Sequence, residues 1–503
     1  MVRREFHFGP SLLLAPRRCT EPLGGGDIRP RAAFSVDTYS PLRWRYVDPI
    51  LGEMSAPTSS ACGAIVWAMK WTNWAGNQTA TPAVFVKPRG RDELSAIVRR
   101  AAAMGRRVKV VGAGHSFTDI AATDGVLISL DNHNRVLDVD RQSKRVTVEA
   151  GIRLFDLCPA LAALGLAMSN LGDITEQSVA GAISTSTHGT GLGFESIAAS
   201  VVGLELIDGA GNLVSCSDTE DVDLWRVARV GLGALGIIAT VTIQCVDAFA
   251  LHAIEDNEPL ADVLATFDRR AAENDHFEFF WLPYTSRAFT KHNERLAEVP
   301  PPRTRAEQAK HAVSKDLVEN VGLGAAIKLG KARPDLVPRL SNAMAKRFSR
   351  REYTLPSHEV FATKRRVRFT EMEYALPLQE FANVFGELLE LIDRLGTPIS
   401  LPVEVRVLGG DDIALSTATG RESVYIAIHM AKGVAFDAYF AGAEDIFSRH
   451  AGRPHWGKLH FQKASTLAPL YPQWDAFQAA RSRMDPEGRY TNAYLERVLG
   501  PVR

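Results

Sequence analysis

The spacing of hydrophobic and polar positions changes along the chain, and each change predicts an element. An apolar run at residues 83–86 predicts a short strand, and apolar residues at helical spacing over 92–102 predict an amphipathic helix. Acidic residues open this helix and Gly105 follows it, as helix-end signals require. A second strand is predicted at residues 107–111. Together these segments predict a β-α-β unit.

Alternation at period two predicts antiparallel strands over much of the remaining chain. Residues 135–140 and 145–149 predict one hairpin, and residues 201–207 and 212–215 predict another around the turn Asp208-Gly209. Residues 295–350, rich in charge, proline and alanine, predict helices and long connections. Further strands are predicted at residues 276–284, 371–375, 403–407 and 424–429. The fold class predicted from this mixture is α+β.

Size and composition indicate a folded protein of more than one unit. A chain of 503 residues exceeds the length at which one hydrophobic core keeps growing. Lysine plus arginine and aspartate plus glutamate both number 58, so no global charge steers the protein toward nucleic acid. The five cysteines are widely spaced without a CxxC motif, which favours unpaired thiols and a cytoplasmic location. No apolar run has the ~20 residues of a transmembrane helix, and peripheral membrane association stays open.

The N-terminal segment differs in composition from the remainder. Residues 1–70 are rich in proline, glycine and arginine, which predicts a poorly ordered extension or an over-called translation start. Arg3-Arg4 could open a twin-arginine signal, but the apolar segment that follows is short and is interrupted by charge. The folded protein is therefore expected to begin near Trp71.

A glycine-rich loop follows the strand at residues 107–111. In Gly112-Ala113-Gly114, glycines let backbone N–H groups converge on an anion such as a pyrophosphate. A nicotinamide site would need a third glycine at the position of Phe117, and no P-loop motif occurs. The loop therefore predicts a phosphate-bearing cofactor, with a purely structural glycine turn as the alternative.

Two later stretches extend this pattern. Residues 172–191 are rich in small and hydroxyl-bearing side chains, as expected where a chain wraps a large polar cofactor. Residues 233–238 bring glycines into an apolar strand, where another backbone or a ring could approach closely. Taken alone, the first stretch could be a serine- and threonine-rich loop.

With Glu404-Val405-Arg406 and residues 453–458, these motifs occur in an order that resembles the vanillyl-alcohol-oxidase-type FAD family. The sugar-1,4-lactone oxidoreductases are the members most similar, namely the L-gulono-1,4-lactone dehydrogenase and D-arabinono-1,4-lactone oxidase types, over about residues 71–500. The resemblance implies a two-subdomain FAD-binding domain of the PCMH type and a substrate-binding cap domain with an antiparallel sheet and flanking helices. The boundaries expected are 71–250 for the FAD-binding domain, 251–445 for the cap and 446–503 for a C-terminal segment returning to the flavin.

The resemblance implies a covalent bond between His115 and the 8α-methyl group of FAD. Neutral imidazole is a competent nucleophile, and its ordinary pKa leaves it largely neutral at pH 7. The alternative is a His115 that only packs against the dimethylbenzene edge. The residues expected at the cofactor are Val111, Gly112, Ala113, Gly114, His115, Ser116, Ser178, Gly181, Thr185, Ser186, Thr187, His188, Ile238 and Lys458.

Oxidation of a hydroxyl-bearing carbon by hydride transfer requires groups that hold the substrate and stabilise growing negative charge. Glu404 and Arg406, two apart on a strand, share one face, and the resemblance places that face and Lys458 over the flavin as catalytic residues. Without the resemblance, a surface ion pair would explain them as well. Asp173 and His429 are expected to contact substrate, with a core histidine as the alternative for His429. No metal site is expected.

The electron acceptor and the substrate stay open. In the resembled family a residue near the flavin gates oxygen, and Gly172 at that place leaves access open, so O2 or an acceptor such as a cytochrome or quinone is expected. The predicted substrate is a sugar lactone. The alternatives are an open-chain polyol, as for alditol oxidases, a flavin reductase fed by NAD(P)H, and a non-catalytic flavin-binding protein.

Overall fold

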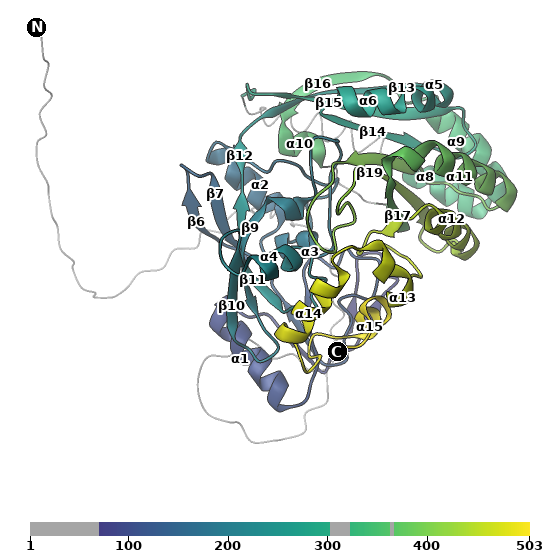
Figure 1. The fold of residues 1–503 in the computed structure, drawn as a ribbon. Helices are drawn as coiled ribbons and strands as arrows, with labels where there is room; N and C mark the ends of the chain where they lie inside the picture. Colours follow the sequence, from purple (N-terminus) through teal and green to yellow (C-terminus); the bar gives the residue numbers. More distant parts are fainter. Residues whose placement is uncertain (1–69, 302–321, 363–366, 503) are drawn as a thin grey trace, which may run out of the picture. The chain divides into compact units, whose positions relative to one another are not determined.

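The computed structural model describes residues 70–301, 322–362 and 367–502. The N-terminal extension expected over residues 1–70 lies outside this range, apart from Lys70. None of the helices in the described ranges combines the length and apolar character that crossing a membrane requires. The helices and strands form two groups, each with its own core (Figure 1).

The first group is built on a small parallel sheet and a larger antiparallel sheet. The parallel sheet has the order β3-β5-β4, so β5 lies between the two strands of the β-α-β unit. The antiparallel sheet has the order β10-β9-β11-β7-β6 and contains both predicted hairpins. The strands are β1 (Trp71–Thr72), β2 (Thr79–Ala80), β3 (Val84–Val86), β4 (Val108–Val111), β5 (Val126–Ser129), β6 (Val136–Asp140), β7 (Arg145–Glu149), β8 (Leu166–Ala167), β9 (Val201–Ile207), β10 (Leu213–Ser217), β11 (Ile237–Gln244) and β12 (Val246–Asp247).

Helices pack against these sheets and join them into one core. Buried leucine and valine of the amphipathic first helix meet buried side chains of the strands. The C-terminal helices belong to the same core, and α14 lies beside α4 in contact with it (Figure 1). The helices of this group are α1 (Gly90–Ala103), α2 (Leu154–Ala163), α3 (Val179–Ser184), α4 (Val222–Ala228), α13 (Ala464–Leu467), α14 (Trp474–Met484) and α15 (Ala493–Leu499).

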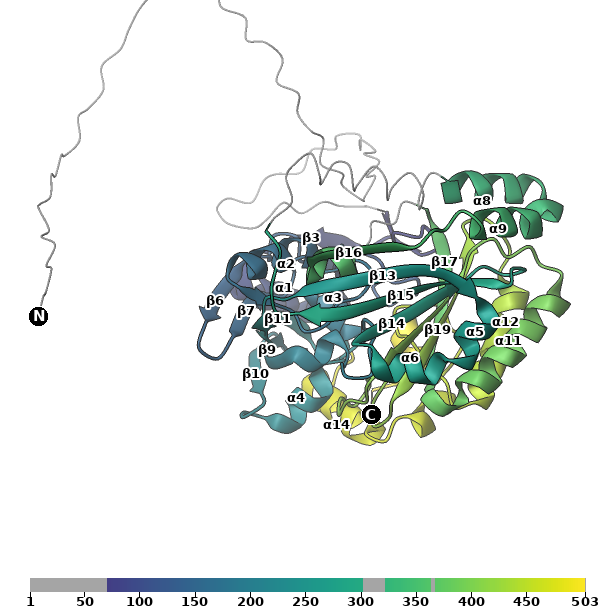
Figure 2. The same cartoon turned by 90° about the horizontal axis from the view of Figure 1, so that it is seen from above.

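The second group is an eight-stranded antiparallel sheet with most of its helices packed on one face (Figure 2). Its strand order is β16-β13-β15-β14-β18-β19-β17-β20. The strands are β13 (Ala250–Pro259), β14 (His276–Trp281), β15 (Arg287–Leu296), β16 (Arg351–Pro356), β17 (Phe369–Pro377), β18 (Val403–Leu408), β19 (Ser423–Ala431) and β20 (Arg453–Pro454). The helices are α5 (Leu260–Ala265), α6 (Phe267–Glu273), α8 (Leu323–Ala332), α9 (Val337–Ala345), α10 (Ser357–Phe361), α11 (Phe381–Leu395) and α12 (Asp437–Arg449).

The strands of the large sheet divide their residues between an apolar and a polar face. On β18, Val403, Val405 and Val407 belong to the core with the helices, so Glu404 and Arg406 point to the opposite face. The neighbouring strands β14, β19 and β17 alternate in the same way. The sheet therefore carries a second, polar face opposite these helices. The short α10 packs at this face, where Lys291 donates to the carbonyl of Val360, a residue of the first core.

Most strands predicted from alternation are present within one or two residues of their expected ends, and the range 295–350 contains α8 and α9 after the end of β15. The strand expected over 276–284 ends at Trp281, whose indole nitrogen donates to Thr285 in the turn that follows. Strands β13 and β15 were not predicted, because charged residues on both faces conceal their alternation. They pair along their whole length in the sheet, which compensates for this weak local signal.

Candidate functional site

A cavity of about 950 Å³, which includes its opening to solvent, lies among the glycine-rich segments. Strand β4 and the loop after it form one wall, and α3 and the start of β11 form others. Of the residues predicted at the cofactor, those that line it are Val111, Gly112, Ala113, Gly114, His115, Ser116, Ser178, Gly181, Thr185 and Ile238.

The glycines of the first loop are required by close packing. A Cβ atom on Gly112 would lie 2.2 Å from the hydroxyl oxygen of Ser178, which caps α3 by accepting from the amide of Gly181. Gly114 has φ of +69°, a conformation that glycine adopts without the strain of a side chain. The loop can therefore bring its backbone close to a ligand, as a dinucleotide cofactor requires.

Two polar atoms at this cavity fit a bound group. Nε2 of His115 and Oε1 of Gln177 are buried without a hydrogen-bond partner, and both residues line the cavity. Buried polar groups normally have partners. The residues present therefore fit a large polar cofactor such as FAD.

His115 is held in a neutral, rigid state. Its ring stacks on Trp74 with ring centroids 5.2 Å apart, and the amide of Trp74 donates to the carbonyl of Gly114 at 2.7 Å. Burial lowers the pKa of His115 to about 4, with further lowering by the cations Arg153 and Lys458. An unprotonated ring nitrogen is thus available at pH 7.

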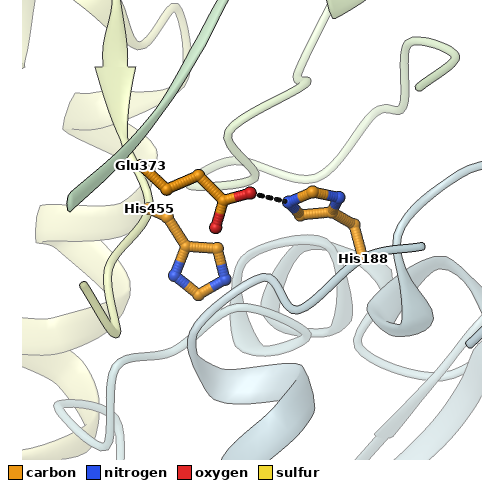
Figure 3. Close-up of side chains that lie close together, drawn as sticks. All are labelled: His188, Glu373 and His455. Carbon is orange, nitrogen blue, oxygen red and sulfur yellow. Dashed lines mark ion pairs between the residues drawn. The ribbon is translucent and has the colours of Figure 1, made fainter. Parts of the chain in front are cut away.

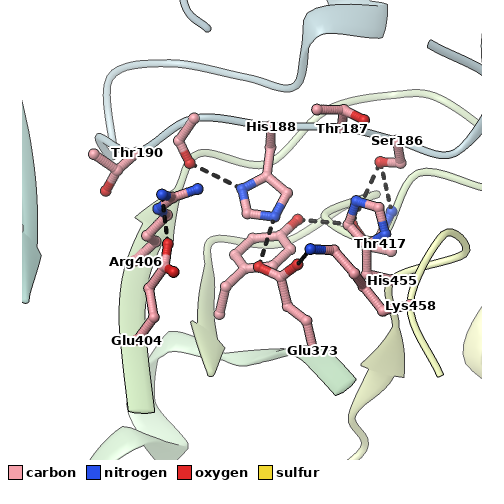
Figure 4. A network of polar contacts seen from close by, with 12 residues as sticks. Ser186, Thr187, His188, Thr190, Glu373, Glu404, Arg406, Thr417, His455 and Lys458 are labelled. Atoms are coloured by element: carbon pink, nitrogen blue, oxygen red, sulfur yellow. Dashed lines mark hydrogen bonds and ion pairs between the residues drawn. The ribbon is translucent and has the colours of Figure 1, made fainter. Parts of the chain in front are cut away.

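The polar face of the large sheet presents a row of buried charges toward the first group of elements (Figure 4). Register brings them together, because Lys291 pairs with Glu278, Glu278 with Arg406, and Glu371 with His429 across neighbouring strands. We call this set the charged face. It consists of Lys291, Glu278, Glu404, Arg406, His429, Glu371 and Glu373.

Arg406 is clamped between two carboxylates of the charged face. Its Nε lies 2.9 Å from an oxygen of Glu278, and a terminal guanidinium nitrogen pairs with Glu404. Burial alone would lower the pKa of Arg406, but Glu404 and Glu278 hold it above its usual value. Burial raises the pKa of Glu404, and the charge of Asp173 adds to this against the opposing charge of Arg406.

Lys458 approaches the charged face from the segment after β20. Its ammonium pairs with Glu371 and lies 3.8 Å from an oxygen of Glu373. Although burial opposes it, these carboxylates raise the pKa of Lys458, which stays a cation. The same nitrogen lies 5.4 Å from the ring centre of Phe117, so Lys458 links the charged face with the loop that carries His115.

Three residues predicted at the cofactor, Ser186, Thr187 and His188, do not line the cavity. They lie near the place where the charged face meets the loop of His115, which we call the junction. Nε2 of His188 is 3.2 Å from Glu373 (Figure 3), and Thr187 accepts a hydrogen bond from Gln177 at 3.0 Å. The hydroxyl of Ser186 lies 3.4 Å from those of Ser416 and Thr417.

Three predicted positions border this junction. Nε2 of His429 is 3.5 Å from Glu371, and the charge of Asp173 acts on Glu278, Glu404 and Arg406. Gly172 is buried against the His188 carbonyl. The structure thus brings these residues to the same region as Lys458 and Arg406.

The prediction from sequence missed the carboxylates Glu278, Glu371 and Glu373. All three lie in strands, where alternation would lead us to expect a buried position to be apolar and a glutamate to be exposed. All three glutamates are nevertheless buried. A glutamate pair two apart within an apolar strand is a signal that could have found Glu371 and Glu373.

Comparison with known proteins identifies related families and sequences. The family model "D-arabinono-1,4-lactone oxidase" matches residues 241–498, and the model "FAD binding domain" matches residues 82–217. L-gulono-1,4-lactone dehydrogenase of Mycobacterium tuberculosis is 43% identical over 431 residues, covering 86% of this chain and 99% of that protein. L-gulonolactone oxidase of Bos taurus is 34% identical over 439 residues, covering 86% and 98%.

The fold also matches solved structures. A solvent-stable cholesterol oxidase superposes with a TM-score of 0.71 at 19% identity, covering 87% of this chain and 98% of that one. This likeness shows a common fold, the PCMH-type FAD-binding domain with a large antiparallel sheet, and thereby confirms the predicted fold class. The cofactor expected from the glycine-rich loops is likewise confirmed as FAD. By sequence and fold together, the chain belongs to the D-arabinono-1,4-lactone oxidase family of FAD-dependent oxidoreductases.

Proposed function

We propose that the protein oxidises a hydroxyl group of a sugar-1,4-lactone of the L-gulono or D-arabinono type. The observation that carries the proposal is the charged face, where Glu404 and Arg406 are buried, together with Lys458, which pairs with Glu371 and whose charge acts on the cavity residue His115. The names of the relatives support a lactone as substrate. A protein that only stored flavin would not need these buried charges, because buried charge is costly.

The residues of the charged face have distinct roles in this proposal. Bound FAD supplies the acceptor for the hydride. Arg406, fixed by Glu278 and Glu404, donates hydrogen bonds to the oxygen on which negative charge develops. Glu404, whose pKa burial raises, accepts the proton of the reacting hydroxyl. Asp173 and His429 bind the other hydroxyl groups of the lactone.

Lys458 and His115 act on the cofactor in this proposal. The ammonium of Lys458, held by Glu371, favours the gain of negative charge by the flavin. His115 holds FAD through a covalent bond from its buried, unpartnered Nε2 to the 8α-methyl group. The neutral state of this imidazole and its fixed stacking on Trp74 support the bond.

The two hydrophobic cores suggest how the chain is divided into domains. We place the FAD-binding domain at residues 71–250, the cap at 251–445 and a C-terminal segment that returns to the flavin at 446–503. The first core contains residues from both ends of this range, and most core residues of 251–445 belong to the second core, which supports this division. The contact of Lys458 with Phe117 supports a C-terminal segment that returns to the loop of His115.

The test is anaerobic reduction of the bound flavin. The protein is mixed in separate samples with L-gulono-1,4-lactone, D-arabinono-1,4-lactone, xylitol and NADPH, and the flavin absorbance near its visible maximum is followed. Bleaching by a lactone at a rate well above that with xylitol supports the proposal. Faster bleaching by xylitol would establish the polyol oxidase instead, and bleaching by NADPH alone would establish a reductase.

The electron acceptor is a separate proposal. Gly172 lies where a Cβ atom would meet the carbonyl oxygen of His188 and the methyl group of Thr187, each at 3.2 Å. We propose that the lack of a side chain at Gly172 leaves a path for O2 to the reduced cofactor, so Gly172→Ala lowers reoxidation by O2 and leaves reoxidation by a dye or cytochrome. Equal losses with O2 and with the dye would show that the substitution only disturbs the His188 loop.

A further inference from the structure

Lys109, near the start of β4, is a buried lysine among the residues that line the FAD cavity. Only 3% of its surface is exposed. Its ammonium donates to the carbonyl oxygen of Tyr490 at 3.1 Å and lies 3.5 Å from the carbonyl oxygen of Gly233. Both of these residues also line the cavity. The ammonium is therefore held between two segments of the cavity wall that are far apart in the chain.

The contacts of Lys109 leave its charge without a matching anion. Both carbonyl oxygens are neutral acceptors, and an ammonium has three N–H donors. Asp485 acts on Lys109 through its charge, but its two carboxylate oxygens accept from the amides of Arg489 and Tyr490. Within the described ranges, Lys109 has no carboxylate partner at ion-pair distance. One N–H of the ammonium is thus left for a ligand.

The surroundings of Lys109 oppose its charge in the absence of such a ligand. Burial lowers its pKa to about 7, and the cation Arg481 lowers it further, while Asp485 and Asp119 raise it. A buried charge is costly unless it is paired. An anion bound in the cavity would supply the missing partner.

The position of Lys109 indicates which part of FAD it would meet. His115, proposed to hold the flavin ring, stands four residues beyond the end of β4, and Lys109 stands near the start of that strand. A strand rises about 3.3 Å per residue, so the backbone of Lys109 lies about 10 Å along the chain from Gly112. We therefore expect Lys109 beside the part of FAD that extends beyond the ring.

That part of FAD contains one anionic group. It consists of a ribityl chain, a diphosphate, a ribose and adenine, and only the diphosphate is charged at pH 7. Lysine binds phosphate as a point charge, and the backbone amides of a glycine-rich loop bind it through their dipoles. The ammonium of Lys109 and the loop that begins at Gly112 line the same wall of the cavity. They are therefore complementary to the same anion.

We propose that Lys109 binds the diphosphate of FAD by donating its third N–H to a phosphate oxygen. This inference rests on FAD as the cofactor and does not depend on the substrate that is oxidised. The carbonyls of Tyr490 and Gly233 hold the ammonium in place before the cofactor binds, so little side-chain freedom is lost on binding. The alternative is a lysine that only ties β4 to the segment of Tyr490.

Phosphorus-31 NMR of the holoenzyme tests the contact directly, because the two phosphorus atoms of FAD give separate signals. We expect Lys109→Met to move at least one of these signals. Lys109→Arg, which keeps a cation, should also move a signal, because a guanidinium replaces the ammonium beside the phosphate. Unmoved signals in either variant would overturn the proposal, so it stays testable if Lys109→Met does not fold.

Lys291→Met is the matched control for this measurement. Lys291 is also buried, and its ammonium donates to the carbonyl oxygen of Val360 at 3.0 Å, but it lies on the charged face, 3.4 Å from Glu278. Its replacement removes a buried lysine of the same kind away from the glycine-rich loop. Both phosphorus signals should stay unmoved.

A competition experiment measures the contribution of Lys109 to affinity. In His115→Ala, FAD is held without a covalent bond, so ADP and adenosine can each displace it, and the released flavin is followed by its fluorescence. We expect Lys109→Met in this background to weaken ADP by about 10- to 100-fold, the effect of one hydrogen bond to a charged group. Adenosine, which lacks the diphosphate, should bind as before. If the double variant is isolated without flavin, the rise in Tm with each ligand replaces the displacement.

The ratio of the two affinities separates the proposal from its alternatives. A lysine that only ties β4 to the segment of Tyr490 predicts a lower Tm with an unchanged ratio of ADP to adenosine affinity. A contact with the adenine base predicts equal losses for both ligands. Either result would overturn the proposal. Reduction of the flavin by a lactone is a separate measurement, so failure of lactone oxidation would leave the role of Lys109 standing.

Discussion

Replacing Arg406 with lysine tests whether a guanidinium is needed between two strands. Nε of Arg406 donates to Glu278 on β14 at 2.9 Å, and a terminal nitrogen pairs with Glu404 on β18 itself. The planar guanidinium of arginine can donate to both carboxylates at once. A lysine ammonium is a compact charge on a flexible stem, and it reaches one of these carboxylates at the expense of the other.

The magnitude follows from the bonds that are lost. A hydrogen bond to a charged group contributes about 1.5–3 kcal/mol, so losing one of two lowers the free energy of unfolding by about that amount. The expected loss of catalytic rate corresponds to a larger free energy than this loss of stability. Removing one preorganised donor from the oxygen that gains charge costs about 10²–10³ in rate, or about 2.7–4 kcal/mol. We therefore expect Arg406→Lys to slow flavin reduction by this factor.

The assay is anaerobic stopped-flow reduction of the flavin by saturating lactone at 25 °C, with unfolding followed in parallel. Arg270→Lys is the matched control, because Arg270 binds both oxygens of Glu258, at 2.8 and 2.6 Å, in the cap. The control should lose stability and keep its rate. The reasoning is refuted if Arg406→Lys reduces the flavin within about threefold of the wild-type rate, or if Arg270→Lys slows it equally.

Three further predictions concern the cofactor loop and pH. Acid precipitation of the wild-type protein should leave yellow colour in the pellet, and His115→Ala should release it; colour released by both would remove the covalent bond. Gly112→Ala, whose Cβ would meet Ser178 at 2.2 Å, should lower bound FAD per protein, whereas Gly386→Ala in α11, where a Cβ meets open space, should retain FAD and raise Tm. Because burial lowers the pKa of His276 to about 4, against 6.5 in the unfolded chain, its contribution to stability is lost as pH falls from 6.5 toward 4. His276→Gln should therefore make unfolding free energy less dependent on pH in that window, by at most about 1.4 kcal/mol per pH unit, and an unchanged slope in urea titrations would contradict this.

Local patterns were sufficient to predict most strands and the cofactor loop. The alternation at residues 403–407 placed Glu404 and Arg406 on one face of a strand, and the structure confirms this placement. The glycine-rich loop after β4 lines the cavity as expected. Such predictions succeed because strand alternation and glycine conformations depend on residues close together in the chain.

The partners of these residues could not be predicted in the same way. Glu278 lies 128 residues before Arg406 in the chain, and only the pairing of β14 with β18 brings them into contact. Likewise Glu373 meets His188 because the large sheet faces the loop after α3. The order of strands in a sheet is decided by nonlocal packing, so no local pattern shows which charges will meet.

The two faces of the same strands indicate why these charges are retained. On the side of the helices, Val403, Val405 and Val407 form an ordinary apolar core, which is the more stable way to bury a strand. On the other side Glu404 and Arg406 are also buried, and replacing such a pair by apolar residues is often neutral or stabilising by about 1–4 kcal/mol. Packing therefore does not account for the charged face. Because the charges stand on adjacent strands, their spacing is set by the register of the sheet rather than by mobile loops. A rigid array of this kind can be complementary to charge that develops during a reaction, which is the reason to expect catalysis at this face.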